Sequence, residues 1–554
     1  MLMDRLISRN PFSATLSPHR WPAWSCRVTC LVCAICLGGP VLAQTAQYPL
    51  EDTFRLQSRS TATKTIYLDF DGHVTTGTEW NDSSTPTITT APYSFEGNAA
   101  FSSNELTRIQ EIWERVAECF SPFDINVTTK APPVDDLINS GGLDTRWGVR
   151  VAVGVTTPDP SPLSYRGKGG GANINDSFSW DSDTPVYIFP QWFPTVILDE
   201  RKLAKAIADT IVHEVGHTLG LNHDGSISPV DIYYRGHGSG PTGWAPHMGL
   251  GYTKYLVQWS KGEYRSADNQ EDDLARITTL NGFGYRPDDY ASSRQTAGAI
   301  GGAVISGGFS IDQRGVIEQR TDSDWFKITA GAGTISLSAL GGTFNTMLDI
   351  QMDLYDASGK LLVSSNPATA VTAQISQAVA AGTYFVRIDG VGNGDPLTTG
   401  YTDYGSLGNY RILGSYVMPN DPGNVTATYS AADKSLTLTG DTGGNGVTVT
   451  YSSQSRQISV QGTNGTRING LVTIPAFSHT GPLKLAAVLD NGHDSITVTG
   501  ADLSTADITL GNGNDIATFT LCNVNILRVY GGAGVDSLVT TSSTIGRKTV
   551  TNVP

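Results

Sequence analysis

Cysteine is nearly absent from this 554-residue chain once its N-terminal stretch is set aside. Four of the six cysteines fall within residues 1–43, and only Cys119 and Cys522 follow. Two cysteines so far apart in sequence exclude a framework of several disulfides, although an oxidising compartment would permit one. We expect both side chains to be buried thiols, so the fold must be stabilised by its hydrophobic cores.

Basic tracts and long apolar runs are also missing. The formal charge is −15, and residues 1–43 hold four Arg and one Asp, a charge of +3, so the remainder carries −18. Such a surface repels nucleic acid and anionic lipid, and the sequence has no P-loop or dinucleotide fingerprint. After residue 43 no segment is long and apolar enough to span a bilayer. We therefore expect neither a nucleic-acid partner nor a stable membrane anchor.

The first 43 residues have the pattern of a secretory signal. Several arginines precede an apolar core from Val28 to Leu37, and Val41-Leu42-Ala43 is a small-residue cleavage site. The apolar core is too short to cross a membrane comfortably. We expect cleavage after Ala43, a secreted protein, and a short N-terminal segment over residues 44–62.

Residues 213–224 read HEVGHTLGLNHD and contain three histidines at metal-ligand spacing. His213 and His217 are one helical turn apart, so both imidazoles leave the same helix face and can reach one metal ion. An apolar residue at every fourth position from Leu203 to Leu219 indicates that helix. The spacing therefore predicts two zinc ligands on one helix.

The third ligand depends on a sharp turn after the helix. Gly220 permits a left-handed backbone conformation that ends the helix and returns the chain, so His223 can reach the same metal. Glu214 follows the first histidine and is placed to take a proton from a metal-activated water. The pattern predicts one catalytic zinc with Glu214 as general base, and peptide-bond hydrolysis without a covalent nucleophile.

HEVGHTLGLNHD resembles the extended zinc motif of the metzincin metallopeptidases, and APHMGLGY provides a methionine downstream. The resemblance implies that the three histidines bind zinc, that Glu214 is the base, and that Met248 lies beneath the metal. Asp224, directly after the third histidine, resembles the adamalysin and snapalysin pattern. Gly220, Asp224 and Met248 are thus expected to support the site.

Two nearby residues allow more than one interpretation. Astacins and serralysins have a tyrosine two residues after the methionine, whereas this chain has Leu250 there and Tyr252 two positions further. Tyr252 either stabilises an oxyanion or, the interpretation we prefer, only packs. His247 is likewise interpreted as structural in preference to a fourth ligand.

Residues 63–287 as a whole are expected to form an α+β metzincin-like domain, with a mixed twisted sheet and the active-site helix. They resemble secreted bacterial metzincin-like proteins of planctomycete type. Residues 169–176 (GGGANIND) are interpreted as the edge strand against which an extended substrate lies. Alternating and helical hydrophobic periods predict strands over 65–70, 124–129 and 150–155, and helices over 104–119 and 271–277.

The helical periodicity of hydrophobic residues ends near Pro287. Short segments in which apolar and polar residues alternate follow, separated by glycines. Residues 288–416 predict an all-β sandwich and resemble the pre-peptidase C-terminal domain of secreted bacterial peptidases. That resemblance implies a role in substrate tethering or secretion. Members of that family often bind calcium, so Asp322, Asp324 or Asp349 is either a source of ligand oxygens or an ordinary turn aspartate.

Residues 417–554 are rich in Thr, Val, Gly and Asn. Asp494, Asp515 and Asp536 recur at a 21-residue spacing, which predicts stacked coils, an all-β solenoid. Residues 531–539 (GGAGVDSLV) match the calcium nonapeptide of repeat-in-toxin proteins, but the period is neither nine nor eighteen. These turns are interpreted as plain tight turns, with calcium as the alternative.

The leading functional prediction is a secreted zinc endopeptidase that acts on protein or peptide substrates. The alternative is an extracellular adhesion or matrix-binding protein whose peptidase domain is vestigial or processes only the chain itself. In that case the β regions would bind a matrix or cell-surface ligand. The complete set of ligands and base favours the first prediction.

Overall fold

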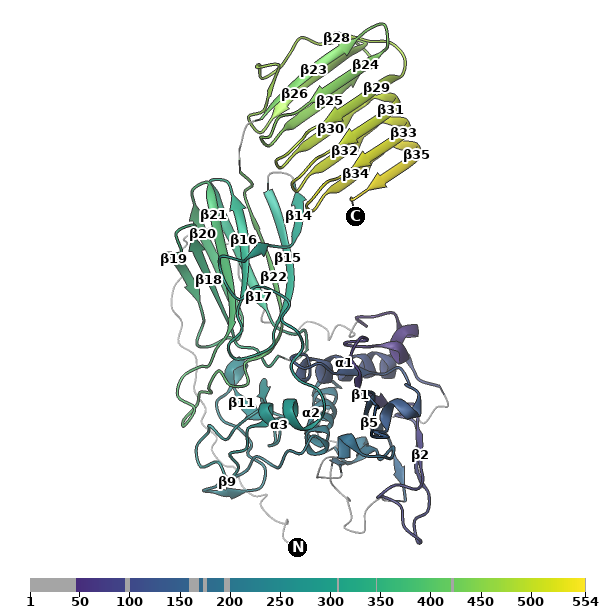
Figure 1. Ribbon diagram of the computed structural model, residues 1–554, viewed down its shortest axis with the longest axis vertical. Helices are drawn as coiled ribbons and strands as arrows, with labels where there is room; N and C mark the ends of the chain where they lie inside the picture. Colours follow the sequence, from purple (N-terminus) through teal and green to yellow (C-terminus); the bar gives the residue numbers. More distant parts are fainter. Residues whose placement is uncertain are drawn as a thin grey trace, which may run out of the picture. The chain divides into compact units, whose positions relative to one another are not determined.

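The computed structural model describes residues 46–94, 100–158, 169–172, 177–193, 200–305, 308–344, 346–419 and 423–553. The predicted signal and its cleavage site lie outside the described residues. The described chain is mostly β-sheet with few helices and is built from several sheets, as a β-rich multidomain protein (Figure 1). None of its helices is long and apolar enough to cross a membrane.

The region expected to be catalytic is built on a five-stranded sheet in the order β4-β1-β5-β8-β7. Four of these strands are parallel, and β7 pairs antiparallel with β8 at the edge. The sheet is therefore mixed, as predicted. Its strands are β1 (Lys64–Asp69), β4 (Asn126–Thr128), β5 (Trp147–Val153), β7 (Gly170–Gly171) and β8 (Val186–Ile188). A second sheet contains β2 (His73–Thr75), β3 (Ile88–Thr90) and β6 (Thr156–Thr157).

Three α-helices accompany these sheets: α1 (Ser103–Cys119), α2 (Glu200–Thr218) and α3 (Asp273–Leu280). A capping box begins α1, because the Ser102 hydroxyl accepts from the Glu105 backbone while the Glu105 carboxylate accepts from the Ser102 backbone. Helices α1 and α2 pack together. On α2 the predicted apolar face is buried over its last three turns, and the buried Cys119 closes α1 as a free thiol.

The remaining elements of this region are short. They are two small pairs of strands, β9 (Ser226–Ile227) with β10 (Val230–Asp231) and β11 (Trp244–Pro246) with β12 (Leu256–Gln258). Short 3-10 helices are η1 (Leu50–Arg55), η2 (Val134–Leu137), η3 (Ser177–Ser179), η4 (Pro190–Trp192) and η5 (Gly240–Thr242).

Residues 298–416 form two five-stranded sheets, in line with the predicted sandwich. Strand β16 alternates buried and accessible side chains, with Phe326 and Ile328 fully buried, which is typical of a strand with one face in a core. One sheet contains β13 (Gly298–Ala299), β16 (Asp324–Ala330), β21 (Gly382–Gly390), β18 (Ile350–Asp356) and β19 (Leu361–Ser365). The other contains β14 (Gly302–Ile305), β15 (Gly308–Ile317), β22 (Gly408–Tyr416), β17 (Gly333–Leu340) and β20 (Ala373–Val379).

The C-terminal region consists of two sheets whose later strands stack in parallel with a 21-residue register (Figure 1, yellow). Asp515 Oδ1 accepts from the Asp494 backbone at 2.8 Å, and Asp536 Oδ1 accepts from the Asp515 backbone at 3.1 Å. The repeated aspartates thus join successive coils. The strands are β23 (Asn424–Ser430), β24 (Ser435–Thr439), β25 (Gly446–Ser452), β26 (Gln457–Thr463), β27 (Arg467–Ile468), β28 (Phe477–Ser478), β29 (Leu483–Val488), β30 (Ser495–Thr499), β31 (Asp502–Thr509), β32 (Ile516–Thr520), β33 (Asn523–Tyr530), β34 (Ser537–Thr541) and β35 (Thr544–Thr551).

The first strands of that region differ from the simple repeat. β23 pairs antiparallel with β24, and β25 pairs antiparallel with β26, before the parallel stacking begins at β29 and β30. The 21-residue aspartate spacing occurs only in the later coils, so the sequence period could not indicate these hairpins. Cys522 is a buried free thiol within the stacked part.

A continuous hydrophobic core joins the predicted catalytic region to the sandwich, whereas the C-terminal sheets have a core of their own. Polar contacts also connect α1 to the sandwich. Glu118 accepts from the Asn409 backbone at 3.3 Å and from the Asn409 side-chain amide at 2.5 Å. Arg115 donates to the Phe344 carbonyl at 2.5 Å. Because the Glu118 carboxyl is removed from water, burial raises its pKa to about 8.

This buried carboxyl makes stability depend on pH. Folding raises the pKa of Glu118 from 4.5 to about 8. The protonated carboxyl therefore contributes fully to the free energy of unfolding below about pH 4.5, and this contribution is lost as the pH rises through about 8. Glu118→Gln keeps the shape without the charge. We expect its melting temperature to exceed that of wild type by several degrees at about pH 9 and by much less at about pH 5. Equal differences at both pH values, or the same trend in Glu51→Gln, an exposed position, would contradict this account.

Candidate metal centre

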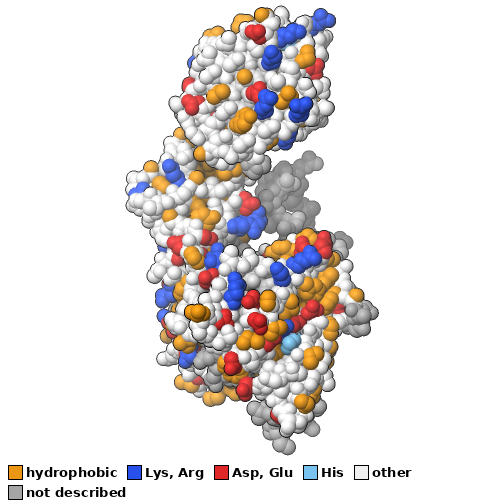
Figure 2. All heavy atoms as spheres, turned by 45° about the vertical axis from the view of Figure 1, so that its right-hand side comes forward, with side chains coloured by type: hydrophobic (Ala, Val, Ile, Leu, Met, Phe, Trp, Pro, Cys, Tyr) orange, Lys and Arg blue, Asp and Glu red, His pale blue; other side chains and the backbone are white. Residues whose placement is uncertain are grey.

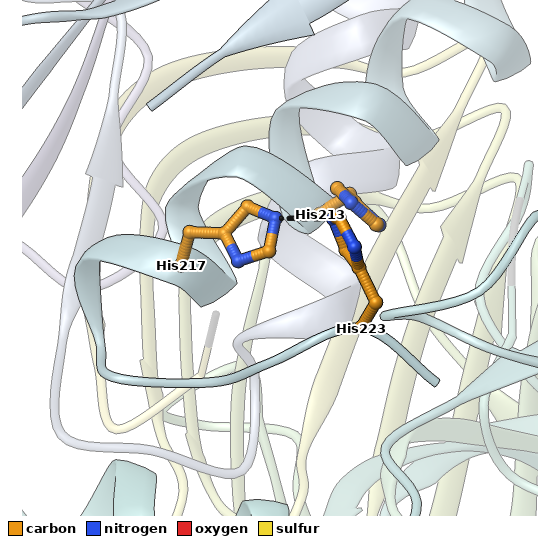
Figure 3. A group of neighbouring side chains, drawn as sticks. All are labelled: His213, His217 and His223. Carbon is orange, nitrogen blue, oxygen red and sulfur yellow. Dashed lines mark hydrogen bonds between the residues drawn. The ribbon is translucent and has the colours of Figure 1, made fainter. Parts of the chain in front are cut away.

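Three histidines converge at the end of α2. His213 and His217 project from the last two turns of the helix, and His223 returns from the loop that follows (Figure 3). One ring nitrogen from each lies within 4.8 Å of the others, and the Nε2 atoms of His217 and His223 are 3.0 Å apart. The structure thus brings the predicted ligand set together at one point.

Backbone carbonyls fix the protonation pattern of two of these rings. His213 Nδ1 lies 3.0 Å from the His247 carbonyl oxygen, and His217 Nδ1 lies 2.8 Å from the Leu221 carbonyl oxygen. A carbonyl oxygen only accepts, so each Nδ1 donates and each Nε2 keeps a lone pair directed at the shared point. Burial lowers the pKa of both side chains, which keeps them neutral. Two neutral imidazoles with Nε2 turned to the shared point, together with the ring of His223 beside them, form a ligand set that fits a zinc ion.

The turn that returns His223 has the geometry expected of Gly220. Its φ is 90°, a conformation that glycine adopts without steric cost. The Gly220 amide donates to the His217 carbonyl at 3.0 Å, and the Leu221 amide donates to the Gly216 carbonyl at 3.0 Å. This is a glycine-terminated helix end, and it also places the Leu221 carbonyl at His217 Nδ1.

Met248 lies directly beneath the helix turn that carries the two histidines. Its side chain is fully buried, and a Cβ added at Gly216, between His213 and His217, would meet the Met248 sulfur at 2.5 Å. Met248 O also accepts from the Asp224 amide at 2.9 Å. The predicted methionine and the loop after His223 are therefore held together.

Asp224 is buried, and its environment is acidic. Burial, followed by the charges of Glu271 and Asp268, raises the pKa of its carboxyl well above the usual range. Those same two acids hold the loop. Glu271 accepts from the Asn222 amide at 2.5 Å, and Asp268 accepts from the Gly225 amide at 2.7 Å. Asp224 therefore lies in the part of the loop that Glu271 and Asp268 hold in place.

The edge strand lies beside the predicted base. A Cβ at Gly170, in β7, would meet Glu214 Cγ at 2.8 Å and Glu214 Oε1 at 3.0 Å, so only glycine fits there without displacement. The sequence interpretation of residues 169–176 as an edge strand holds for Gly170 and Gly171, and residues 173–176 lie outside the described residues. The edge strand of the described sheet therefore lies directly against the Glu214 side chain.

Tyr233 is a site residue that the sequence reasoning missed. Its ring centroid lies 4.5 Å from that of His223 and 5.9 Å from that of His213. Burial, followed by the charge of Glu214, raises the pKa of its hydroxyl. No periodic pattern marks this tyrosine, and only its place ten residues after His223, in the loop before Met248, connects it with the motif.

Tyr252 and His247, each of which had two interpretations from the sequence, make defined contacts. The Tyr252 hydroxyl lies 2.8 Å from Thr210 Oγ1 on α2, which favours the packing interpretation. Burial is the main cause that raises the pKa of Tyr252 to about 12. The buried His247 ring packs against Trp259 with centroids 4.6 Å apart. It is absent from the converging group, so the structural interpretation holds among the described residues.

An acidic group forms a second candidate site, where the chain enters the sandwich. Carboxylate oxygens of Asp288, Asp322 and Asp324 lie within 4.8 Å of one another, and Asp288 also forms such a group with Asp289 and Glu318. Asp349, by contrast, accepts from the Tyr401 hydroxyl at 2.7 Å and is not in either group. Asp322 and Asp324 are buried, so they are not solvated turn aspartates. No motif or spacing in the sequence marks Glu318 as a candidate ligand.

No family model matches this sequence, and no curated protein matches it. Solved structures do match; one is the pre-peptidase C-terminal domain of the collagenase from Bacillus anthracis, at 15% sequence identity and a TM-score of 0.15. That match covers 23% of this chain and 95% of the solved one.

On the side drawn in Figure 2, the surface has no broad region of a single charge sign. Acidic and basic side chains are interspersed there, and histidine atoms reach the surface at one place, next to acidic and hydrophobic side chains.

Proposed function

We propose that this protein is a secreted zinc endopeptidase of the metzincin type. One observation carries the proposal: ring nitrogens of His213, His217 and His223 lie within 4.8 Å of one another, and the side chain of Glu214, on the same helix, lies against the edge strand at Gly170. This set is complete, which favours a working peptidase over an adhesion protein with a vestigial site.

When bound, zinc would supply Lewis acidity, which lowers the pKa of water and polarises a peptide carbonyl. The chain's own residues would do the rest. An extended peptide would pair with the main chain of β7, which brings its scissile bond beside Glu214. Glu214 would take a proton from the attacking water and pass it to the leaving amine. The Tyr233 hydroxyl would donate to the oxygen on which negative charge develops.

Glu214→Gln tests the role of the base separately from that of the metal. We expect the variant of residues 44–554 to retain one zinc per chain while its kcat/KM on a protein substrate falls by about a thousandfold or more. Chelation should abolish cleavage by wild type, and added zinc should restore it. Glu51→Gln, at an exposed position in the 3-10 helix η1, serves as control. Cleavage by Glu214→Gln at the wild-type rate would contradict the proposal.

Tyr233→Phe tests the proposed oxyanion donor. The ring remains and only the hydroxyl is lost, so kcat should fall about tenfold or more while zinc content and KM change little. The matched control is Tyr255→Phe, because Tyr255 is 52% exposed. If Tyr233→Phe retained the full kcat, the hydroxyl would have no part in the transition state.

A structural calcium ion at the acidic group is a second proposal. Carboxylate oxygens are the ligands that calcium prefers, and several of those present are buried without a hydrogen-bond partner. They include Asp322 Oδ1, Asp324 Oδ1 and both oxygens of Glu318, which itself is only 1% exposed. Burial raises the pKa of Asp324 to about 8 and that of Glu318 to about 9. Arg286 Nε lies 3.5 Å from Glu318 Oε1 and offsets part of this charge, and a divalent cation would compensate for the remainder.

Calcium should therefore raise the melting temperature of the wild-type protein, by mass action on the folded state. We expect Asp324→Asn to lose most of that increase. Asp349→Asn, which changes a buried aspartate of the same sandwich outside the acidic group, should keep it. Thermal unfolding with excess calcium and with a calcium chelator measures the effect. An equal calcium response in all three proteins would exclude this site.

A further inference from the structure

Met347 of the sandwich contacts the segment that carries Met248. It lies just before β18 and is fully buried in the core shared by the two regions. Its sulfur is 3.4 Å from Nε2 of His247, and its carbonyl oxygen accepts from the side-chain amide of Gln258. A residue outside the predicted peptidase domain is thus in direct contact with the residue that precedes Met248.

The two residues that Met347 touches also hold each other. The His247 amide donates to the Gln258 carbonyl at 2.8 Å, continuing the pairing of β11 with β12. The Gln258 side chain also accepts from the Trp244 indole at 2.8 Å. Around them, Trp244 and Leu256 pack with Val371 and Tyr401 of the sandwich. The position of His247 therefore depends on contacts from both regions.

His247 in turn positions a metal ligand. Its backbone carbonyl is the acceptor for His213 Nδ1 at 3.0 Å. A metal-binding imidazole is oriented by the acceptor of its second nitrogen, and loss of such a partner typically weakens metal binding by about ten- to a hundredfold. A continuous series of contacts thus runs from Met347 through His247 to His213.

A second contact joins the sandwich to the loop that carries Tyr233. His237 Nε2 lies 2.5 Å from the Gly400 carbonyl oxygen, and His237 Nδ1 lies 2.7 Å from the hydroxyl of Tyr234. The Tyr234 amide donates to the Asp224 carbonyl at 2.7 Å. The sandwich therefore supports the site at two separate points, the methionine segment and the Tyr233 loop.

From this geometry we infer that the sandwich is a fixed part of the metal centre, and that Met347 is a positioning residue that acts on His213 through His247. The inference rests on the proposed zinc function and adds a role to a region expected only to tether substrate or assist secretion. Without Met347 the His247 ring would keep Trp259 on one side but lose its contact with the sandwich, and the carbonyl that orients His213 would be free to shift.

Met347→Ala in the full chain tests this inference. We expect its zinc affinity, measured by competition with a chelator, to be about tenfold or more below that of wild type. The absorption spectrum of the cobalt-substituted protein should change as the ligand geometry relaxes. Met347→Leu, which restores the apolar bulk, should recover zinc affinity to within about threefold of wild type. If Met347→Ala does not fold, Met347→Val should show the same direction of change.

Asn409→Ala is the matched control. It removes a contact of the same interface, the one to Glu118 on α1, and does not touch His247. We expect its zinc affinity and cobalt spectrum to match those of wild type. The inference would be overturned by a folded Met347→Ala protein with unchanged affinity and spectrum, or by an equal loss in Asn409→Ala. A wild-type chain that binds no zinc would instead overturn the proposed function itself.

Discussion

His213 and His217 each donate through Nδ1 to a backbone carbonyl oxygen, and the candidate site depends on these two hydrogen bonds. A neutral imidazole has one donor and one acceptor, so engaging Nδ1 as the donor leaves Nε2 as the free lone pair. Both rings are buried, which disfavours the charged form that could not bind a metal. The protein alone therefore sets the position, tautomer and charge of these two candidate ligands.

Neighbouring parts of the described site hold those two carbonyl groups in position. The Leu221 carbonyl is placed by the glycine turn that ends α2, the same turn that returns His223. The His247 carbonyl is placed by the pairing of β11 with β12 and by the sandwich, through Met347. The position of the Leu221 carbonyl thus depends on local sequence. The position of the His247 carbonyl depends also on Met347, which lies 100 residues away in the sequence.

That difference explains how much the sequence could predict. The i, i+4 spacing of His213 and His217, the need for Gly220 and the 21-residue aspartate repeat are local or periodic signals, and each corresponds to a described feature. Tyr233, Met347 and the group around Asp288 have no such signal, because their roles arise from contacts between segments distant in sequence. The antiparallel hairpins β23–β24 and β25–β26 could not be predicted either, because they precede the regular 21-residue repeat.

X-ray absorption at the zinc edge of the purified protein tests the central claim most directly, because it reports the ligands and not the activity. The account predicts one zinc bound by nitrogen and oxygen at about 2.0–2.1 Å, with the outer-shell scattering of three imidazoles. Replacing His223 by alanine should reduce that scattering to two. A sulfur ligand at about 2.3 Å, or a spectrum without imidazole scattering, would contradict it.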